Sequence, residues 1–266
     1  MTTTFTANNA EAYQHHMGRW SERLATSFLD FASLDDPGSI LDVGCGTGSL
    51  TFLLAERFRN AQLAGIDFSQ SYVDFARARA GSRDISFEQG DASAMKYADQ
   101  SFDSTLSLLV LNFIPGPEKA VREMARVTKG GGIVAASVWD FRGGAPYLRM
   151  LFDTAAMLDP EEGGATRARA FSMPLTNPGE LTAMWQRIGL REIVESFLTI
   201  RMEFASFADY WEPFLGGQGV TGSYVKGLPA EKRSLLEHHV RLAYLSGSDD
   251  GPRSFATTAC AVRGVR

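Results

Sequence analysis

The sequence has little cysteine, since Cys45 and Cys260 are the only two in 266 residues. Two cysteines cannot build the disulfide framework of a small secreted module or a zinc site made of cysteine pairs. No run approaches the roughly 18 consecutive apolar residues that a membrane span needs, and the N-terminal segment lacks the basic start and apolar stretch of a targeting peptide. We therefore expect a cytoplasmic protein with no membrane partner.

Positive charge is also scarce, because 26 Lys and Arg stand against 31 Asp and Glu and leave a net charge of −5. A main interface for nucleic acid would need an excess of positive charge, so a small-molecule substrate is favoured and no nucleic-acid partner is expected. The four histidines form two adjacent pairs, at 15–16 and 238–239. Adjacent helical residues point about 100° apart, so neither pair is expected to share a metal, and no metal site is predicted.

Short apolar runs alternate with helical periodicity between residues 38 and 132, which is typical of βα units that build a parallel sheet. The runs cover residues 39–43, 62–66, 85–87, 105–111 and 133–139. Two further strands are expected at 192–204 and 254–262. The segment 206–251 between them is too long for a hairpin loop and is expected to hold two helices, around 207–215 and at 230–245. The pattern predicts an α/β fold built on a mostly parallel sheet.

The same pattern divides the chain into a core and a mainly helical cap. The core is expected at 36–140, 176–205 and 252–266, and the cap at 1–35, 141–175 and 206–251. Ligands of open α/β sheets bind at the carboxyl ends of the strands, so the cap is expected to lie above those ends. A monomer and a homodimer both remain open.

The first apolar run leads directly into a loop with three alternating glycines, in the segment DVGCGTGS at residues 42–49. Gly44, Gly46 and Gly48 allow the backbone to turn tightly and a ligand to approach it closely. A dinucleotide fingerprint would need glycine where Ser49 stands, which weakens that interpretation. No Gly-Lys-Ser/Thr follows, so a Walker-type phosphate loop is excluded.

Acidic residues stand at the ends of the next two predicted strands. Asp67 follows the second strand, where a carboxylate can accept hydrogen bonds from both hydroxyls of a ribose. Asp91 ends the third strand within the segment QGDA at residues 89–92. At that position it would meet the edge of an adenine.

These motifs, with GIDFS at 65–69, FD at 102–103 and KGGG at 129–132, resemble those of class I S-adenosylmethionine-dependent methyltransferases of the small-molecule type. The resemblance covers residues 38–140 closely and extends loosely to the C-terminus. It implies an α/β, Rossmann-like, doubly wound fold whose seven-stranded sheet has the order 3-2-1-4-5-7-6 with the last strand antiparallel. It also implies S-adenosyl-L-methionine as cofactor and S-adenosyl-L-homocysteine as product.

The resemblance also assigns site residues. It places the loop glycines against the methionine moiety, Asp67 on the ribose hydroxyls and Asp91 on the adenine amino group. Asn112 and Phe113 match positions that face the substrate. The cofactor-binding positions it implies are Asp42, Gly44, Cys45, Gly46, Gly48, Asp67, Phe68, Ser69, Asp91, Ala92, Ser107 and Leu108.

Aromatic residues outside these motifs have two interpretations. Tyr13 and Trp20, seven residues apart on one helical face, either belong to the core or close over the sulfonium of the cofactor, since cations are attracted to aromatic faces. Trp139 at the end of the fifth strand and Trp211 in the second insertion are likewise either core or substrate contacts.

Methyl transfer is an in-line displacement at a carbon that the sulfonium already activates, so positioning is the protein's main task. A general base is needed only for a hydroxyl or a protonated amine. The candidates are His15, His16, Asp140 and His239, and nothing in the sequence singles out one of them.

We therefore expect a methyltransferase that acts on a small, apolar or aromatic molecule. A nicotinamide-dependent oxidoreductase on a related nucleotide-binding fold is one alternative. A non-catalytic module that binds S-adenosylmethionine or S-adenosylhomocysteine is the other.

Overall fold

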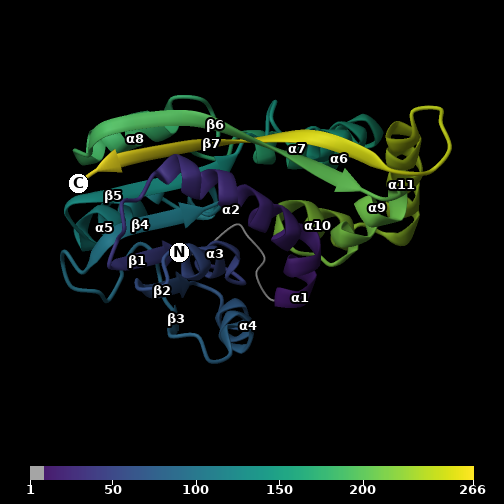
Figure 1. Ribbon diagram of the computed structural model, residues 1–266. Helices are drawn as coiled ribbons and strands as arrows, with labels where there is room; N and C mark the ends of the chain where they lie inside the picture. The colour runs from purple at the N-terminus through teal and green to yellow at the C-terminus, as the bar shows by residue number, and fades with distance from the viewer. Residues whose placement is uncertain (1–8) are drawn as a thin grey trace.

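A single mixed sheet of seven strands organises the computed structural model, which describes residues 9–266 (Figure 1). Its order is β3-β2-β1-β4-β5-β7-β6, with β1 to β5 parallel and β7 antiparallel to both of its neighbours. This confirms the predicted order and the reversed last strand. The strands are β1 Ser39–Val43, β2 Gln62–Asp67, β3 Ile85–Gln89, β4 Phe102–Leu108, β5 Thr128–Trp139, β6 Arg191–Phe204 and β7 Arg253–Val265.

Helices cover the sheet and extend beyond its carboxyl-terminal end. Those that belong to the βα units or their return are α3 Ser49–Arg57, α4 Gln70–Ala80, α5 Pro117–Val127 and α8 Glu180–Ile188. The N-terminal segment forms α1 Ala10–Tyr13, the single π-helical turn η1 Gln14–Gly18 and α2 Arg19–Ala32. The two insertions form α6 Pro146–Leu158, α7 Glu162–Phe171, α9 Phe207–Leu215, α10 Gly219–Gly227 and α11 Ala230–Leu245. Residues 1–8 of the predicted N-terminal segment lie outside the described residues.

Of the seven predicted strands only 39–43 has the observed bounds, and the fourth and fifth show how the others differ. The fourth strand begins at Phe102 rather than residue 105 and ends at Leu108, because Leu109 has a φ of +64° and turns the chain into the 3-10 helix η2 Leu111–Phe113. The fifth begins at Thr128 rather than residue 133. There the Gly131 amide donates to the Arg266 carbonyl at 3.0 Å, so the glycine run already lies in the sheet.

Apolar periodicity determines how the helices pack on the sheet. In α5, Ala120, Val121, Met124 and Val127 are fully buried against one face. All five residues of β1 are buried, as expected of a central strand covered on both faces. The position of β1 places the glycine loop that follows it in the middle of the sheet edge.

The helices of the two insertions gather with α1 at the carboxyl ends of the parallel strands (Figure 1). Tyr210 of α9 joins the two insertions, because its fully buried hydroxyl donates to the Tyr147 carbonyl of α6 at 2.7 Å. Its ring also packs edge-on against Phe204 and Phe214, with centroids 5.3 Å apart in both pairs. This aromatic packing fixes the insertions above the strand ends.

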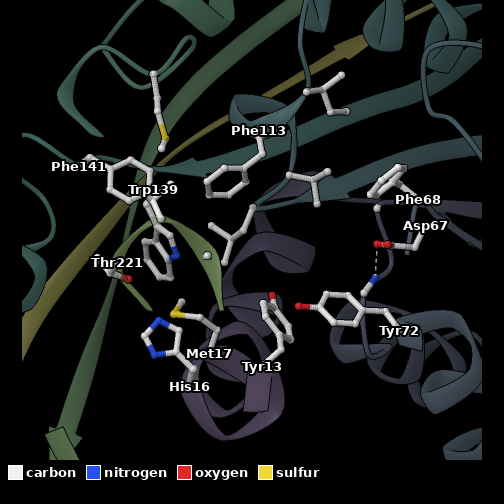
Figure 2. Close-up of a pocket in the computed structure, with 18 of the residues that line it drawn as sticks. Tyr13, His16, Met17, Asp67, Phe68, Tyr72, Phe113, Trp139, Phe141 and Thr221 are labelled. Atoms are coloured by element: carbon white, nitrogen blue, oxygen red, sulfur yellow. Dashed lines mark hydrogen bonds between the residues drawn. The ribbon is translucent and has the colours of Figure 1, made fainter. Parts of the chain in front are cut away.

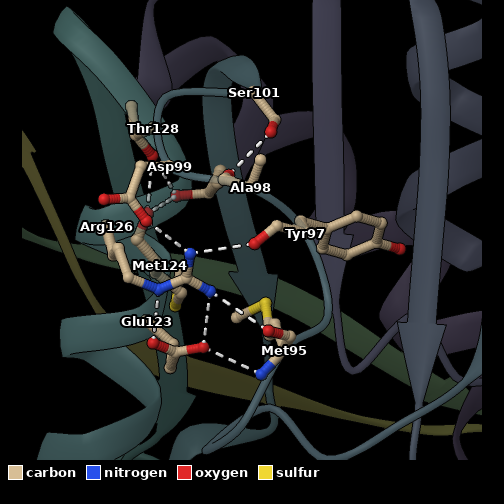
Figure 3. A network of polar contacts seen from close by, with 10 residues as sticks. Met95, Tyr97, Ala98, Asp99, Ser101, Glu123, Met124, Arg126 and Thr128 are labelled. Atoms are coloured by element: carbon tan, nitrogen blue, oxygen red, sulfur yellow. Dashed lines mark hydrogen bonds and ion pairs between the residues drawn. The ribbon is translucent and has the colours of Figure 1, made fainter.

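Arg126 of α5 holds the long connection between β3 and β4 in place (Figure 3). Its guanidinium donates to the carbonyls of Met95 and Tyr97 at 3.1 and 2.8 Å and pairs with Asp99 at 2.7 Å. Glu123 completes the network, because it accepts from Arg126 and from the Met95 amide at 2.8 Å. The connection between β3 and β4 is therefore attached to α5 by two side chains, Arg126 and Glu123.

Candidate cofactor and acceptor site

The loop after β1 bends back onto the end of β2. The amides of Gly44 and Cys45 both donate to the Ile66 carbonyl, at 2.7 and 3.0 Å. Gly44, Gly46 and Gly48 all have positive φ, at +77°, +54° and +93°, which glycine adopts without strain. A Cβ added at Gly46 would meet only Tyr13 Cε1, at 3.9 Å, so the backbone here borders open space.

Asp67 faces this bend. Its Oδ2 accepts from the Gly46 amide at 2.9 Å and its Oδ1 from the Ser69 amide at 2.8 Å. Burial raises the pKa of Asp67, and the two amides partly oppose that rise. Each carboxylate oxygen still has a free lone pair for a ligand hydroxyl.

Asp42 lies beneath the loop and is almost completely buried. Thr51 donates to its Oδ2 at 2.6 Å, while its Oδ1 has no hydrogen-bond partner among the described residues. Burial raises the pKa of Asp42 to about 7, the Thr51 hydrogen bond opposes that rise and the nearby Asp67 adds to it. An unpaired oxygen at this place leaves a position for a donor, such as water or an ammonium group.

A cavity of about 460 Å³ lies between the sheet edge and the insertion helices (Figure 2). One end, which we call the loop end, is lined by Gly44, Gly46, Ile66, Asp67, Phe68, Tyr72, Gly90, Asp91 and Ala92. The other, which we call the aromatic end, is lined by Phe113, Trp139, Phe141, Tyr147, Leu148, Phe152, Ala170, Met173, Val220 and Thr221, among others. The cavity is therefore continuous from the polar loop end, where we call the Gly46 backbone and the Asp67 carboxylate the seat, to the largely apolar aromatic end, which we also call the chamber.

The N-terminal helical segment forms one wall of the cavity. Tyr13, His16 and Met17 line it, and Tyr13 lies against Tyr72 with ring centroids 5.0 Å apart. Gln14 attaches this segment to the glycine loop, because its Oε1 accepts from the Thr47 hydroxyl at 2.8 Å. The segment at the start of the chain thus covers the bend near residue 46.

The structure brings ten of the residues singled out from the sequence to this cavity. They are Tyr13, His16, Gly44, Gly46, Asp67, Phe68, Asp91, Ala92, Phe113 and Trp139. Five others, namely Asp42, Cys45, Gly48, Ser69 and Leu108, lie beneath or beside the wall without lining it. Ser107 faces away from it, because its hydroxyl donates to the Val43 carbonyl at 2.9 Å within the sheet.

Three residues expected near the cofactor or substrate instead belong to the core. Trp20 packs against Phe204 with ring centroids 5.4 Å apart, so it does not close over the cavity. Trp211 stacks on Phe207 inside the insertion helices, and Asn112 turns its amide to the Met173 sulfur at 3.6 Å. The two tryptophans are therefore held by aromatic neighbours, and Asn112 contacts Met173, which lines the cavity, without lining it itself.

Only one of the candidate bases lines the cavity. His15 is exposed on the outer side of η1, and His239 packs against His238 on α11. Asp140 accepts from the amides of Arg142 and Gly143 at 2.9 Å in both cases, in the turn after β5. His16 alone among these four remains at the site.

Several lining residues escaped the sequence analysis. Tyr72 lies on α4, Tyr147 and Phe152 on α6, and Val220 and Thr221 on α10. Apolar and aromatic residues on helices look like ordinary core in a sequence, and α10 was not predicted at all. Only the position of α6 and α10 above the strand ends makes these residues part of a site.

The chain belongs to a known family. Residues 34–168, half of the chain, match the family model described as a methyltransferase domain. The sequence is 35% identical over 121 residues to ajmaline N-methyltransferase of Rauvolfia serpentina, which covers 42% of this chain and 41% of that protein. It is 33% identical over 122 residues to a ubiquinone/menaquinone biosynthesis C-methyltransferase of Bdellovibrio bacteriovorus, which covers 45% of this chain and 49% of the relative. The matches thus span about half the length of these relatives or less.

The fold is shared with solved structures over almost the whole chain. The YcgJ protein of Bacillus subtilis superposes with a TM-score of 0.59 at 18% identity, over 92% of this chain and 98% of that one. The sheet is therefore the Rossmann-like sheet of class I methyltransferases, with S-adenosylmethionine as the cofactor. This membership decides against the nicotinamide-dependent alternative.

The residues present fit that cofactor. Open space above Gly46 admits a ligand against the backbone, and the Asp67 carboxylate borders the same space. Asp42 Oδ1 supplies an unpaired buried acceptor below the loop. Within residues 9–266 no helix is long and apolar enough to cross a bilayer.

Proposed function

We propose that this protein transfers a methyl group from S-adenosylmethionine to a small, apolar or aromatic molecule. The observation that carries the proposal is the continuous cavity, which joins the Gly46–Asp67 seat to the aromatic end. Ajmaline and quinone precursors, the acceptors named by the two relatives, are small molecules that would suit such a chamber. Because one relative is an N-methyltransferase and the other a C-methyltransferase, the family leaves the acceptor atom open.

In this proposal the loop end holds the cofactor. Asp67 accepts from the ribose hydroxyls, Asp91 accepts from the adenine amino group with Ala92 beside it, and Phe68 covers the adenine. Gly44 and Gly46 leave room for the methionine moiety, whose ammonium would reach Asp42 through a hydrogen bond or a water molecule. The bound cofactor supplies a methyl group that its sulfonium has already activated.

The chain's own contribution is to orient the acceptor and exclude water. Phe113, Trp139 and Phe141 supply flat apolar walls that would hold a ring in a fixed plane. Holding two reactants in line accounts for about 7 to 11 kcal/mol of barrier in well-aligned model reactions. Tyr13 and His16, on the N-terminal wall, would close the site to solvent on the side away from the sheet.

We also propose the remaining organisation from the same features. The segments 9–35, 141–175 and 206–251 act as a cap over a core at 36–140, 176–205 and 252–266. The protein works in the cytoplasm on a small-molecule substrate, without a nucleic-acid partner.

A labelled-methyl assay tests this function. The protein is incubated with S-adenosylmethionine that carries a labelled methyl group and with a panel of neutral aromatic, quinol and alkaloid acceptors. Transfer of label to at least one acceptor, lost when Trp139 and Phe113 are replaced by alanine, is the expected result. Tight binding of S-adenosylhomocysteine without transfer to any acceptor would instead favour the non-catalytic module.

A further inference from the structure

The aromatic end of the cavity contains polar side chains that the protein itself leaves unpaired. His16 and Trp139 are 8% and 4% exposed, and neither His16 Nδ1 nor Trp139 Nε1 has a hydrogen-bond partner within residues 9–266. Thr221 is 6% exposed and lines the same end (Figure 2). A buried polar group without a partner is unfavourable, so such groups are expected to meet a ligand or a water molecule.

These groups come from three segments that are distant in the sequence. His16 lies in the π-helical turn η1, Trp139 ends β5 and Thr221 lies on α10. Figure 2 shows all three side chains away from Asp67 and Phe68, across the cavity from the loop end. Their convergence on one chamber is a property of the fold, because no short sequence motif contains them.

The described side chains that line the aromatic end carry no charge. The described residues that line the cavity include no lysine or arginine, and their only carboxylates are Asp67 and Asp91 at the loop end. Burial lowers the pKa of His16 to about 4, with smaller contributions from His15 and Arg19, so its imidazole is neutral near pH 7. Arg19 is itself paired with Asp209 at 2.9 Å.

Unpaired neutral groups select the chemistry of their ligand. The indole N–H of Trp139 can only donate, whereas a neutral imidazole has one donor and one acceptor nitrogen. A hydroxyl can accept from the indole and donate to the imidazole at once. The lining side chains within residues 9–266 offer no cation to a carboxylate or phosphate and, at this end, no carboxylate to an ammonium, so burying either ion against them is unfavourable.

We propose that His16 and Trp139, with Thr221 beside them, form a specificity subsite for an uncharged hydroxyl on an otherwise apolar, aromatic acceptor. This inference rests on the proposed function and narrows its substrate class to neutral, hydroxyl-bearing molecules such as phenols. It assigns His16 and Trp139 as positioning residues for that hydroxyl.

Four probes of similar shape test the subsite by calorimetry on protein saturated with S-adenosylhomocysteine. They are 2-naphthol, naphthalene, 2-naphthoate and 2-naphthylmethylammonium, measured at pH 7.5. We expect 2-naphthol to bind about tenfold more tightly than naphthalene, the difference that two neutral hydrogen bonds supply, and the two ions to bind more weakly than either.

Variants connect the preference to the named residues. Trp139→Phe and His16→Phe keep an aromatic ring but remove the polar atoms, so each should bring the naphthol-to-naphthalene affinity ratio close to one. Phe113 lines the same end and has no polar group. Phe113→Leu should therefore weaken the binding of 2-naphthol and of naphthalene and leave the ratio of their affinities unchanged. The ratio is independent of how much each variant is destabilised, as long as it binds S-adenosylhomocysteine.

The outcomes separate the two proposals. Equal affinity for 2-naphthol and naphthalene, an unchanged ratio in both polar variants, tightest binding by one of the ions, or no binding by any probe would overturn the subsite alone. Failure of the wild-type protein to bind S-adenosylhomocysteine would overturn the proposed function.

Discussion

Gly46 determines whether a ligand can reach the backbone of the loop. Its φ is +54° and its missing side chain borders the cavity. Gly189, at the end of α8, also has a positive φ, +88°, and open space around it but does not line the cavity. Comparing alanine variants of the two glycines therefore distinguishes the effect of backbone strain on stability from the effect of a methyl group in the site on ligand binding.

We predict that Gly46→Ala and Gly189→Ala lower the free energy of unfolding by a similar amount, about 1 to 2 kcal/mol, because both force alanine to a positive φ. Only Gly46→Ala should weaken S-adenosylhomocysteine binding, by tenfold or more, since its methyl group would occupy the seat. Urea unfolding and calorimetry measure the two effects. Equal affinity in both variants would mean that the cofactor does not lie against Gly46.

The raised pKa of Asp42 predicts that the free energy of unfolding depends on pH. Its pKa is about 7 in the folded protein against an ordinary 3.8, so the folded state retains a proton that the unfolded chain has released. The resulting loss of stability grows as pH rises from about 4 to about 7 and then levels off. Asp42→Asn cannot ionise and can still accept from Thr51.

We therefore expect Asp42→Asn to gain stability relative to the wild type as pH rises from 4 to 8, by up to about 4 kcal/mol. Urea unfolding at several pH values, without cofactor, gives the difference directly. The neighbouring Asp67 remains in both proteins, so its titration largely cancels. A difference that stays constant across this range would show that Asp42 ionises normally.

At the scale of single residues, the loop end of the site could be predicted, whereas the aromatic end could be predicted only in part, through Phe113 and Trp139. Gly44, Gly46, Asp67 and Asp91 follow strands directly, and parallel strands end at one edge, so local spacing already places them together. Tyr147 has no such marker, because its role depends on how α6 packs over a sheet formed mostly by earlier residues. Trp20 shows the reverse error, since helical spacing alone cannot tell which side of a helix faces a cavity.

Among the elements, the connection from β3 to β4 depends on one arginine. Arg126 has carbonyl and carboxylate partners on this connection, and the pKa of Glu123 is lowered mainly by its hydrogen bond to Arg126. Within residues 9–266, Arg122, one turn earlier on α5, pairs only with the partly exposed Glu118. The two arginines lie on the same helix, but Arg126 bonds to the β3–β4 connection whereas Arg122 bonds to a side chain of its own helix.

We predict that Arg126→Ala lowers the free energy of unfolding by about 2 to 3 kcal/mol, because several charge-assisted hydrogen bonds are lost and Glu123 is left without its partner. Arg122→Ala should cost less than about 1 kcal/mol, as exposed ion pairs do. Urea unfolding of both variants tests this. Equal losses would mean that the network in Figure 3 contributes no more than a surface pair.

Element boundaries follow from the sequence where the pattern is strong. Helices at 207–215 and 230–245 have aromatic and apolar periodicity with a serine or proline before them, and both occur as predicted. α10 was missed because its segment contains three glycines, which disfavour a helix by about 1 kcal/mol each. Tertiary contacts supply what propensity lacks there, since Val225 is fully buried against the other insertion helices.

At the scale of the whole molecule, the site arises where three separate segments meet one sheet edge. The N-terminal segment, the 141–175 insertion and the 206–251 insertion all contribute to the wall opposite the strands. The strand order 3-2-1-4-5-7-6 places β1 and β4 at the centre, so the seat and the chamber lie side by side. The order could be expected from the family resemblance, whereas the shape of the chamber needed the fold.

The central claim is that the bend at Gly46 and the Asp67 carboxylate together bind the adenosyl cofactor. Calorimetric titration of the wild type and of Asp67→Asn with S-adenosylhomocysteine, and of the wild type with NAD, tests it most directly. We predict one S-adenosylhomocysteine site per chain, affinity at least tenfold weaker in Asp67→Asn, and no binding of NAD. Binding of NAD alone, or an S-adenosylhomocysteine affinity that Asp67→Asn leaves unchanged, would contradict the account.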